Sequence, residues 1–286
     1  MAKVMEEGVQ YSTVAPVFEG IPVVSNLGAG IQDPKWTIIG NDAGVVKIKT
    51  NPGEHVDCES GAMVFMSDGT KLKAKFAGCC QAGSGEGLFK ARLVNDADAE
   101  GYVGISNPKP GVVVPLDMGQ FPEGIIVQRG AWFGSITSPS KQEVGVRVIW
   151  GLRNATCGAA CCGGVDFMMQ HITGGPGNYA FVSANGTILE QNLQAGETII
   201  VEQNSILGYS GNVKLSIKQS GGIAECCFSG QGCFNTQLTG PGKIWLQSMS
   251  IAKLRAVVAR QAAGDQEQKK KKGGNGAPAV HEEMER

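Results

Sequence analysis

Internal repetition is the feature of this sequence that most restricts its fold. Residues 51–67, NPGEHVDCESGAMVFMS, align without a gap to residues 194–210, QAGETIIVEQNSILGYS, and GIIVQRGAWFGS at residues 124–135 is a third copy. Each copy is followed by a pair of adjacent cysteines, at Cys79-Cys80, Cys161-Cys162 and Cys226-Cys227. The period of about 60–80 residues suits a module of several strands rather than a solenoid coil. The chain is therefore predicted to contain one β unit three times.

Local patterns within the repeats indicate short β-strands. VVKIKT at residues 45–50 and VKLSIKQ at residues 213–219 alternate apolar and polar side chains, as half-buried strands do. The 42 glycines favour many tight turns between such strands. The sequence predicts an all-β fold of sandwich-like or barrel-like units over residues 35–249. The predicted units are residues 35–111, 112–183 and 184–249.

Both ends of the chain differ from the repeats. Residues 1–34 are predicted to be an N-terminal extension. In residues 250–263 apolar side chains recur at helical spacing, which predicts one short amphipathic helix that caps the β core. Residues 264–286 are polar and Gly-rich and are predicted to be a disordered tail. The run Lys269–Lys272 is interpreted as part of this solvated tail, although basic runs also bind anionic lipid.

Composition argues against several functional classes. The 25 basic and 26 acidic side chains nearly cancel, so charge does not favour nucleic acid or an anionic membrane as a partner. The start of the sequence, MAKVMEEGVQYSTVAP, lacks the apolar core of a secretory signal and the arginines of a transit peptide. No apolar run approaches the roughly 18 residues of a transmembrane helix. These features predict a cytoplasmic protein whose nine cysteines are mostly thiols.

Four ordered motifs resemble one known family. They are GEGLF at residues 85–89, NPKPGVVVPLDM at 107–118, QRGAWFGS at 128–135 and TGPGKIWLQS at 239–248. They are similar to motifs of the altered-inheritance-of-mitochondria family, the twenty-fourth in its series. That family belongs to the superfamily of proteins like the tryptophan RNA-binding attenuation protein (TRAP). The resemblance covers residues 35–249.

The resemblance implies a fold and an assembly rather than an activity. It implies three tandem TRAP-like double-stranded β-helix units, strands exchanged between neighbours, and a homotrimer whose nine units form a ring. The family's molecular activity is not established, and its eukaryotic members are tied to mitochondrial inner-membrane organisation. This sequence has CCGGVDFMM at residues 161–169 where the family pattern has a GEGFF-like run, and it shows no presequence. A mitochondrial location is therefore the alternative to a cytoplasmic one.

Cysteine spacing argues against a metal site within one chain. Only Cys157 and Cys161 have the separation that zinc ligands use, because adjacent thiolates point away from each other. One loop position inherited three times explains the Cys pairs, although equivalent cysteines of a symmetric trimer can meet near its axis. A redox or lipid-attachment role for the pairs is the alternative.

The histidines do not match a cupin-type metal centre, which uses several histidines and a carboxylate on barrel strands. His55 and His171 lie at non-equivalent positions of different units, and His281 lies in the tail. His171 is predicted to be a rim or interface side chain. A metal-dependent enzyme of this kind is therefore not expected.

Two pairs of acids recur in register: Glu54 with Glu197, and Glu59 with Glu202. Because PGE and AGE precede a strand, the first pair is interpreted as solvated turn residues beside a glycine with positive φ. Paired carboxylates are the alternative interpretation, and Glu86 in GEG has the same two interpretations.

Other catalytic and nucleic-acid patterns are missing from the sequence. There is no G-x-S-x-G elbow, and GSGEG at residues 83–87 lacks the Lys-Ser/Thr ending of a phosphate loop. A ring that binds RNA requires regularly spaced basic and stacking aromatic side chains. Five lysines of the units do not occupy equivalent positions, namely Lys71, Lys73, Lys75, Lys214 and Lys218.

The sequence therefore predicts no catalytic, cofactor-binding or metal-ligating residues, and no cofactor. We expect a non-enzymatic, ring-forming homotrimeric β protein that acts as a scaffold or binding module. Its expected partners are further copies of itself and an unidentified protein, with no nucleic acid. One alternative is a peripheral membrane or mitochondrial organisation factor. The other is a metal- or thiol-dependent enzyme that uses the Cys pairs.

Overall fold

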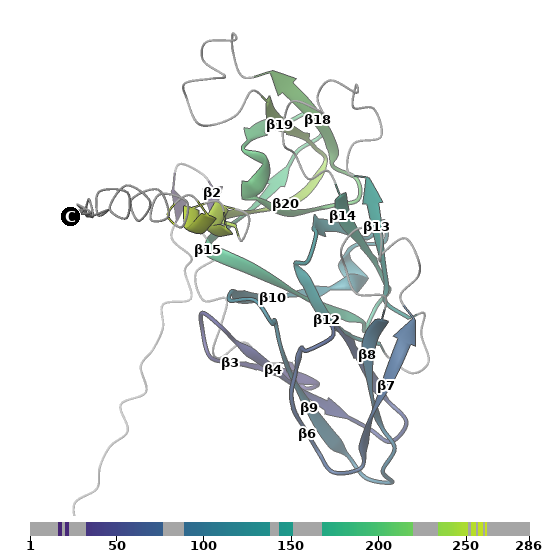
Figure 1. Cartoon of the computed structure of the whole chain (residues 1–286). Coiled ribbons are helices and arrows are strands. Elements are labelled where there is room, and N and C mark those ends of the chain that lie inside the picture. Colours follow the sequence, from purple (N-terminus) through teal and green to yellow (C-terminus); the bar gives the residue numbers. More distant parts are fainter. Residues whose placement is uncertain are drawn as a thin grey trace, which may run out of the picture.

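The computed structural model describes residues 17–18, 21–22, 33–76, 89–137, 143–150, 168–219, 234–250, 253–255, 257–259 and 261. Strands dominate these residues, and the ladders between named strands are antiparallel (Figure 1). Within the predicted extension, β1 (Val17–Phe18) pairs with β2 (Ile21–Pro22). The prediction of an all-β chain with one short helix is confirmed.

The first strand group lies at one end of the molecule (Figure 1). It comprises β3 (Trp36–Ile39), β4 (Val45–Thr50), β5 (His55–Cys58), β6 (Met63–Met66), β7 (Thr70–Phe76), β8 (Phe89–Asn95) and β9 (Gly101–Ser106). β9 pairs with β4 and β6, whereas β8 pairs with β5 and β7. In β4, Val46 and Ile48 are buried while Lys47 and Lys49 are exposed, so the alternation in the sequence does mark a half-buried strand.

The second strand group occupies the middle of the molecule (Figure 1). It comprises β10 (Val112–Asp117), β11 (Ile125–Gln128), β12 (Trp132–Ile136), β13 (Gly145–Trp150), β14 (Met168–Thr173) and the first half of β15 (Tyr179–Leu193). β15 pairs with β10 and β12, whereas β14 pairs with β11 and β13. The 3-10 turn η1 (Met118–Gln120) follows β10.

The third strand group lies at the end opposite the first (Figure 1). It comprises the second half of β15, β16 (Thr198–Val201), β17 (Ile206–Ser210), β18 (Lys214–Gln219), β19 (Phe234–Thr239) and β20 (Gly242–Met249). β20 pairs with β15 and β17, whereas β19 pairs with β16 and β18. The 3-10 turn η2 (Gln203–Ser205) connects β16 to β17.

Two ladders and one long strand connect the groups. β5 of the first group pairs with β12 of the second, and β11 of the second group pairs with β17 of the third. β15 has 15 residues and runs without interruption from the second group into the third, across the predicted unit boundary at residues 183 and 184. These connections join strands of all three groups into one 11-stranded sheet.

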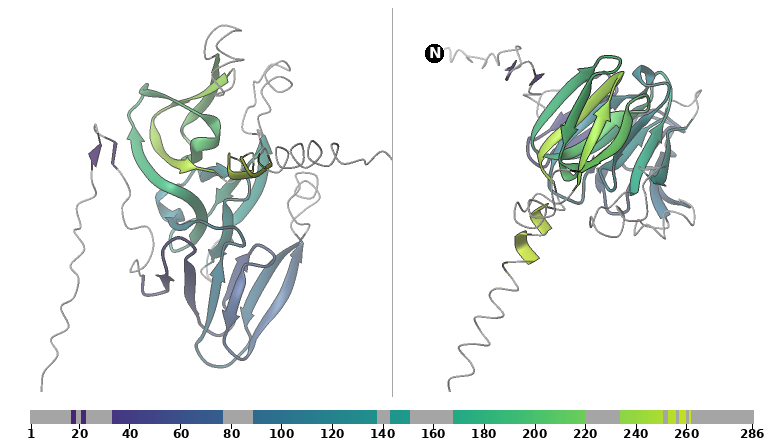
Figure 2. Two further views of the ribbon diagram at one scale, coloured as in Figure 1. Left: turned by 60° about the vertical axis from the view of Figure 1, so that its left-hand side comes forward. Right: turned by 90° about the horizontal axis from the view of Figure 1, so that it is seen from above.

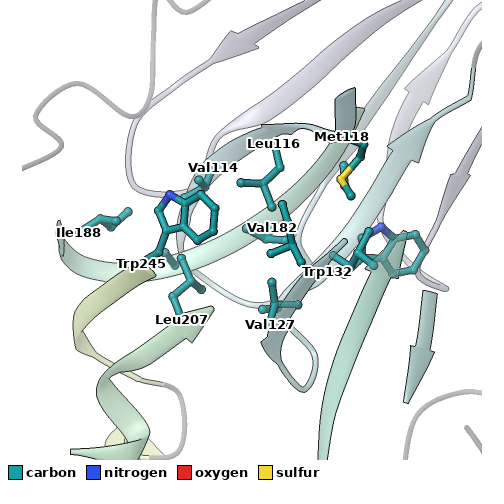
Figure 3. Packing of buried hydrophobic residues seen from close by; sticks show 14 of the residues in the cluster. Val114, Leu116, Met118, Val127, Trp132, Val182, Ile188, Leu207 and Trp245 are labelled. Atoms are coloured by element: carbon teal, nitrogen blue, oxygen red, sulfur yellow. The ribbon is translucent and has the colours of Figure 1, made fainter. Parts of the chain in front are cut away.

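The core is divided into clusters that lie between neighbouring groups. The first cluster holds side chains of the first group together with Val113, Phe133 and Phe181 of the second group. The second cluster holds side chains of the second group together with Ile188, Leu207 and Trp245 of the third (Figure 3). The third cluster is built from the third group, with Met169 added from the second. Each internal boundary is therefore filled from both sides.

A short helix follows the last strand and lies outside the sheets (Figure 2). Residues 253–255, 257–259 and 261 are helical, and Ser250 caps the helix by accepting a hydrogen bond from the Lys253 N–H. Leu254, Val257 and Val258 are exposed, so the prediction that this helix caps the β core is wrong. Of the helices that the described residues form, none is long and apolar enough to cross a bilayer.

Candidate functional site

No metal centre is formed by the residues that the structure describes, because no three His, Cys, Asp or Glu side chains gather there. The Cys pairs, Cys157 and Cys233 lie outside the described residues, as do Glu86, His281 and Lys269–Lys272. Cys58 is buried in β5. Burial, followed by the charges of Asp57 and Glu59, raises the pKa of the Cys58 thiol to about 12. Cys58 is therefore a thiol at neutral pH and a poor nucleophile.

The recurring acids of the PGE and AGE motifs stabilise turns. The Asn51 N–H donates to the Glu54 carboxylate at 2.7 Å, and the Gln194 N–H donates to the Glu197 carboxylate at the same distance. Gly53 and Gly196, which precede these acids, have φ of 77° and 81°, as the sequence predicts. The prediction of a solvated acid is wrong for Glu54, which is buried and paired with Lys35.

Glu202, from the second pair of recurring acids, has a different structural role from Glu54 and Glu197. Glu202 caps η2 by accepting from the Asn204 N–H at 3.1 Å, and it forms an ion pair with Lys253 at 2.6 Å. Burial tends to raise the pKa of Glu202, but the hydrogen bonds from Lys253 and the η2 residues hold it below its usual value. Glu202 therefore carries a structural charge that anchors the helix to the third group.

The two described histidines lie apart, on β5 and β14. His171 is half-buried, and its Nε2 lies 3.0 Å from the Glu123 carbonyl oxygen at the boundary of the second and third groups. His55 Nε2 lies 3.7 Å from Glu143. Burial, followed by Arg92, lowers the pKa of His55. His55 is therefore held as the neutral imidazole near pH 7.

An ion-pair cluster at the boundary of the first and second groups was not found by sequence reasoning. Asp57 of β5 is buried and accepts two hydrogen bonds from Arg92 of β8, at 2.6 and 2.8 Å, and one from Lys75 of β7 at 2.8 Å. Both basic side chains also reach Glu143, which precedes β13. Asp57 between the apolar Val56 and Cys58 is the sequence signal that points to such a partnered charge.

A shallow pocket of about 380 Å³ lies where the second and third groups meet. Its lining residues are Gln120, Phe121, Pro122, Glu123, Gly124, Asn192, Leu193, Ser210, Gly211, Asn212, Gly242 and Lys243. The Lys243 ammonium is already paired with Glu190. The pocket therefore offers amide and hydroxyl groups rather than a paired acid and base.

Two sheet edges at opposite ends of the described chain, β6 and β16, expose apolar side chains, as does the edge strand β7 with Leu72 and Phe76. β6 is the last strand of the sheet β3-β4-β9-β6, and Met63, Val64 and Met66 on it are exposed. β16 is the last strand of the sheet β16-β19-β18, and Ile200 on it is exposed. Exposed apolar edges are templates for pairing with another chain. These two edges are the strongest candidate functional surface.

Comparison with known proteins identifies the family. The family model described as mitochondrial biogenesis AIM24 matches residues 36–249. An uncharacterised protein of Streptococcus pyogenes serotype M6, M6_Spy0233, is 23% identical over 228 residues, which is 76% of this chain and 86% of that protein. The crystal structure of protein SPYM3_0169 from Streptococcus pyogenes superposes with a TM-score of 0.58 at 20% identity, covering 79% of this chain and 99% of that one. The chain therefore belongs to the mitochondrial biogenesis AIM24 family.

Proposed function

We propose that the protein is a non-enzymatic scaffold or binding module that assembles as a closed ring of three chains. In this proposal each chain is three copies of one six-strand unit, and these copies are the three strand groups without β3. The ring presents the surface on which a partner protein binds, and no catalytic step is assigned to it.

The recurrence of one pairing scheme supports the three-unit part of the proposal. β8, β14 and β19 each lie between two strands of their own group. β9, β15 and β20 also each lie between two strands. The turns at Glu54 and Glu197 share the same carboxylate-to-backbone hydrogen bond. Three segments with one topology fit a chain built by triplication.

The observation that carries the ring is that two strand pairings, here called joints, connect successive groups. In the part of the chain that the structure describes, the corresponding strands at the two ends of the series have no such pairing. β12 joins the second group to β5, and β17 joins the third group to β11. β6 corresponds to β12 and β17, while β16 corresponds to β5 and β11. Among the described residues neither β6 nor β16 has a partner from another group. A neighbouring chain that supplies each missing partner continues the series.

A closed ring removes both edges at once, whereas an open chain of copies leaves one at each end. The number of three chains comes from the family resemblance, since three chains of three units give the nine-unit ring that it implies. A ring of this kind would also cover the exposed apolar side chains of β6 and β16.

Light scattering of the purified protein tests the ring. We expect a mass three times the 29.9 kDa of one chain, independent of concentration over a tenfold range. A single-chain mass at every concentration contradicts the proposal.

A second function, attachment to a membrane surface, is favoured by one observation. Leu254, Val257 and Val258 form an exposed apolar stripe at helical spacing, and the run Lys269–Lys272 follows in the sequence. Flotation with vesicles that contain an anionic lipid tests this function. The full chain is expected to float and a chain that ends at Ser250 is not, and equal behaviour of the two contradicts a membrane role for this segment.

A further inference from the structure

The two internal joints share one register. At the β5–β12 joint Cys58 lies opposite Gly134, and at the β11–β17 joint Val127 lies opposite Gly208. Gly134 and Gly208 each follow a one-residue bulge in their own strand, at Phe133 and Leu207. The bulge of β6 falls at Val64, so Phe65 is the residue that corresponds to these glycines.

Burial at the bulge position separates β6 from its two counterparts. Phe133 is 0% exposed in the first cluster and Leu207 is 1% exposed in the second. Each of these side chains thus enters the cluster of the preceding group. Val64 is 52% exposed, and among the described residues no strand group precedes the first one. The third cluster, at the other end of the molecule, is the one that receives no such side chain from a following group.

Next to each bulge, a glycine of one strand lies opposite an aromatic residue of the other. Gly134 pairs with Phe181, and Gly208 pairs with Trp245. In β6 the order is reversed, since Phe65 pairs with Gly104. Space for only one large side chain exists there, because a Cβ on Gly104 would lie 2.4 Å from the Phe65 ring.

The aromatic residues of the two internal joints pack in corresponding clusters. Phe181 packs in the first cluster, which is that of the preceding group. Trp245 likewise packs in the second cluster (Figure 3). Phe65 is only half-buried and contacts the Tyr102 ring edge-on at 6.0 Å. Phe65 therefore corresponds to the buried aromatic residues Phe181 and Trp245, but no preceding group in the described part of the chain offers a cluster in which it could be buried.

From this geometry we propose that β16 of one copy pairs antiparallel with β6 of the next, with Val201 opposite Phe65, Ile200 opposite Met66 and Ile199 opposite Ser67. Val64 and Phe65 then enter the third cluster of the neighbouring copy. This inference rests on the proposed ring and names the contact that closes it. Main-chain hydrogen bonds along the two edges supply affinity, and the two side chains fix the register.

Disulfide cross-linking tests the register directly. Ile200→Cys with Met66→Cys is expected to form covalent oligomers under mild oxidation, because residues directly opposite in a ladder have Cα atoms at disulfide distance. The two single variants report the background from the native cysteines. Ile200→Cys with Met63→Cys is the off-register control, and it is expected to give only that background.

A charge at the bulge position gives a second, independent test. Val64→Glu is expected to raise the concentration at which half of the chains are assembled by at least about tenfold, because the carboxylate would enter an apolar cluster. Val258→Glu is the control, since Val258 is exposed to the same degree and lies on the helix rather than on either proposed edge strand.

The outcomes separate the inference from the proposed ring. In-register cross-links together with a three-chain mass support both. A three-chain mass with cross-linking no higher than in the single variants overturns the β6–β16 pairing and leaves the ring. In-register cross-links in an assembly of another size support the pairing and overturn the three-chain ring. A single-chain mass without cross-links overturns both.

Discussion

Asp57 shows how single residues hold neighbouring strand groups together. It is buried in β5, yet its carboxylate is matched by Arg92 and Lys75, and both of these also contact Glu143 of the second group. Burial tends to raise the pKa of Asp57, but the hydrogen bonds from Arg92 and Lys75 outweigh it and hold the pKa below its usual value. The charge is therefore kept at the boundary of two groups because two cations share it.

Asp57→Asn is expected to cost about 2 kcal/mol of unfolding free energy, because it removes the buried charge that Arg92 and Lys75 share and leaves the half-buried guanidinium with only the exposed Glu143. Urea denaturation at fixed protein concentration measures this change. Glu143→Gln is the matched control and should cost less than about 1 kcal/mol, since Glu143 is half exposed and solvent screens its ion pairs. Equal losses in the two variants would show that burial of Asp57 is unimportant.

The same carboxylate predicts a specific sensitivity to acid. A depressed pKa in the folded state contributes stability above the ordinary Asp value of 3.8, and that contribution is lost as pH falls through the folded pKa. Wild-type stability should therefore fall below about pH 4 by more than the stability of Asp57→Asn. If the unfolding free energies of the two proteins fell in parallel between about pH 5 and about pH 2, this assignment would be contradicted.

At the scale of strands and helices, local sequence patterns predicted individual strands and turns. The alternation in VVKIKT predicted β4, and the glycines of PGE and AGE predicted turns with positive φ. The open edges at β6 and β16 were not predicted, because strands that pair between groups are far apart in sequence, as Cys58 and Gly134 are, and alternation does not reveal the partner. The Asp57 cluster was missed for the same reason, since its members come from three strands and from Glu143, two residues before β13.

Close approach of strands at the joints makes one glycine a sharp probe. A Cβ on Gly208 would lie 2.8 Å from the Ile126 carbonyl oxygen, so Gly208→Ala must push β17 away from β11. We expect a loss of about 1–3 kcal/mol in unfolding free energy. Gly175→Ala is the control, because nothing lies within 4 Å of its Cβ and the expected change is within about 0.5 kcal/mol. A neutral Gly208→Ala would mean that the joint is loosely packed.

The helix offers a contrasting prediction at the same scale. Leu254→Ser and Val258→Ser should each change the unfolding free energy by less than about 0.5 kcal/mol, because both side chains are exposed. Leu238→Ala in β19 should cost about 2–5 kcal/mol, since Leu238 is fully buried. Thermal denaturation compares the three variants. If the helix variants lost almost as much unfolding free energy as Leu238→Ala, the helix would pack on the β core after all.

At the scale of the whole molecule, the chain is a series of three strand groups whose two ends are unlike its interior. The first and second clusters each receive side chains from the group that follows in the chain, whereas no following group among the described residues supplies the third cluster. β6 exposes Val64, which corresponds to the buried Phe133 and Leu207. The repeats and the family resemblance pointed to a ring from sequence. Only the pairing of strands in three dimensions indicates which edges would close the proposed ring, because the register between two strands depends on contacts between distant segments.

Amide hydrogen exchange along the edge strands tests the central claim most directly, since β12 and β17 serve as standards in the same sample. If copies close the edges, amides of Met63–Met66 and Thr198–Val201 exchange as slowly as those of Trp132–Ile136 and Ile206–Ser210. If the edges stay open, β6 and β16 exchange fast while β12 and β17 remain protected. The second result would contradict the ring.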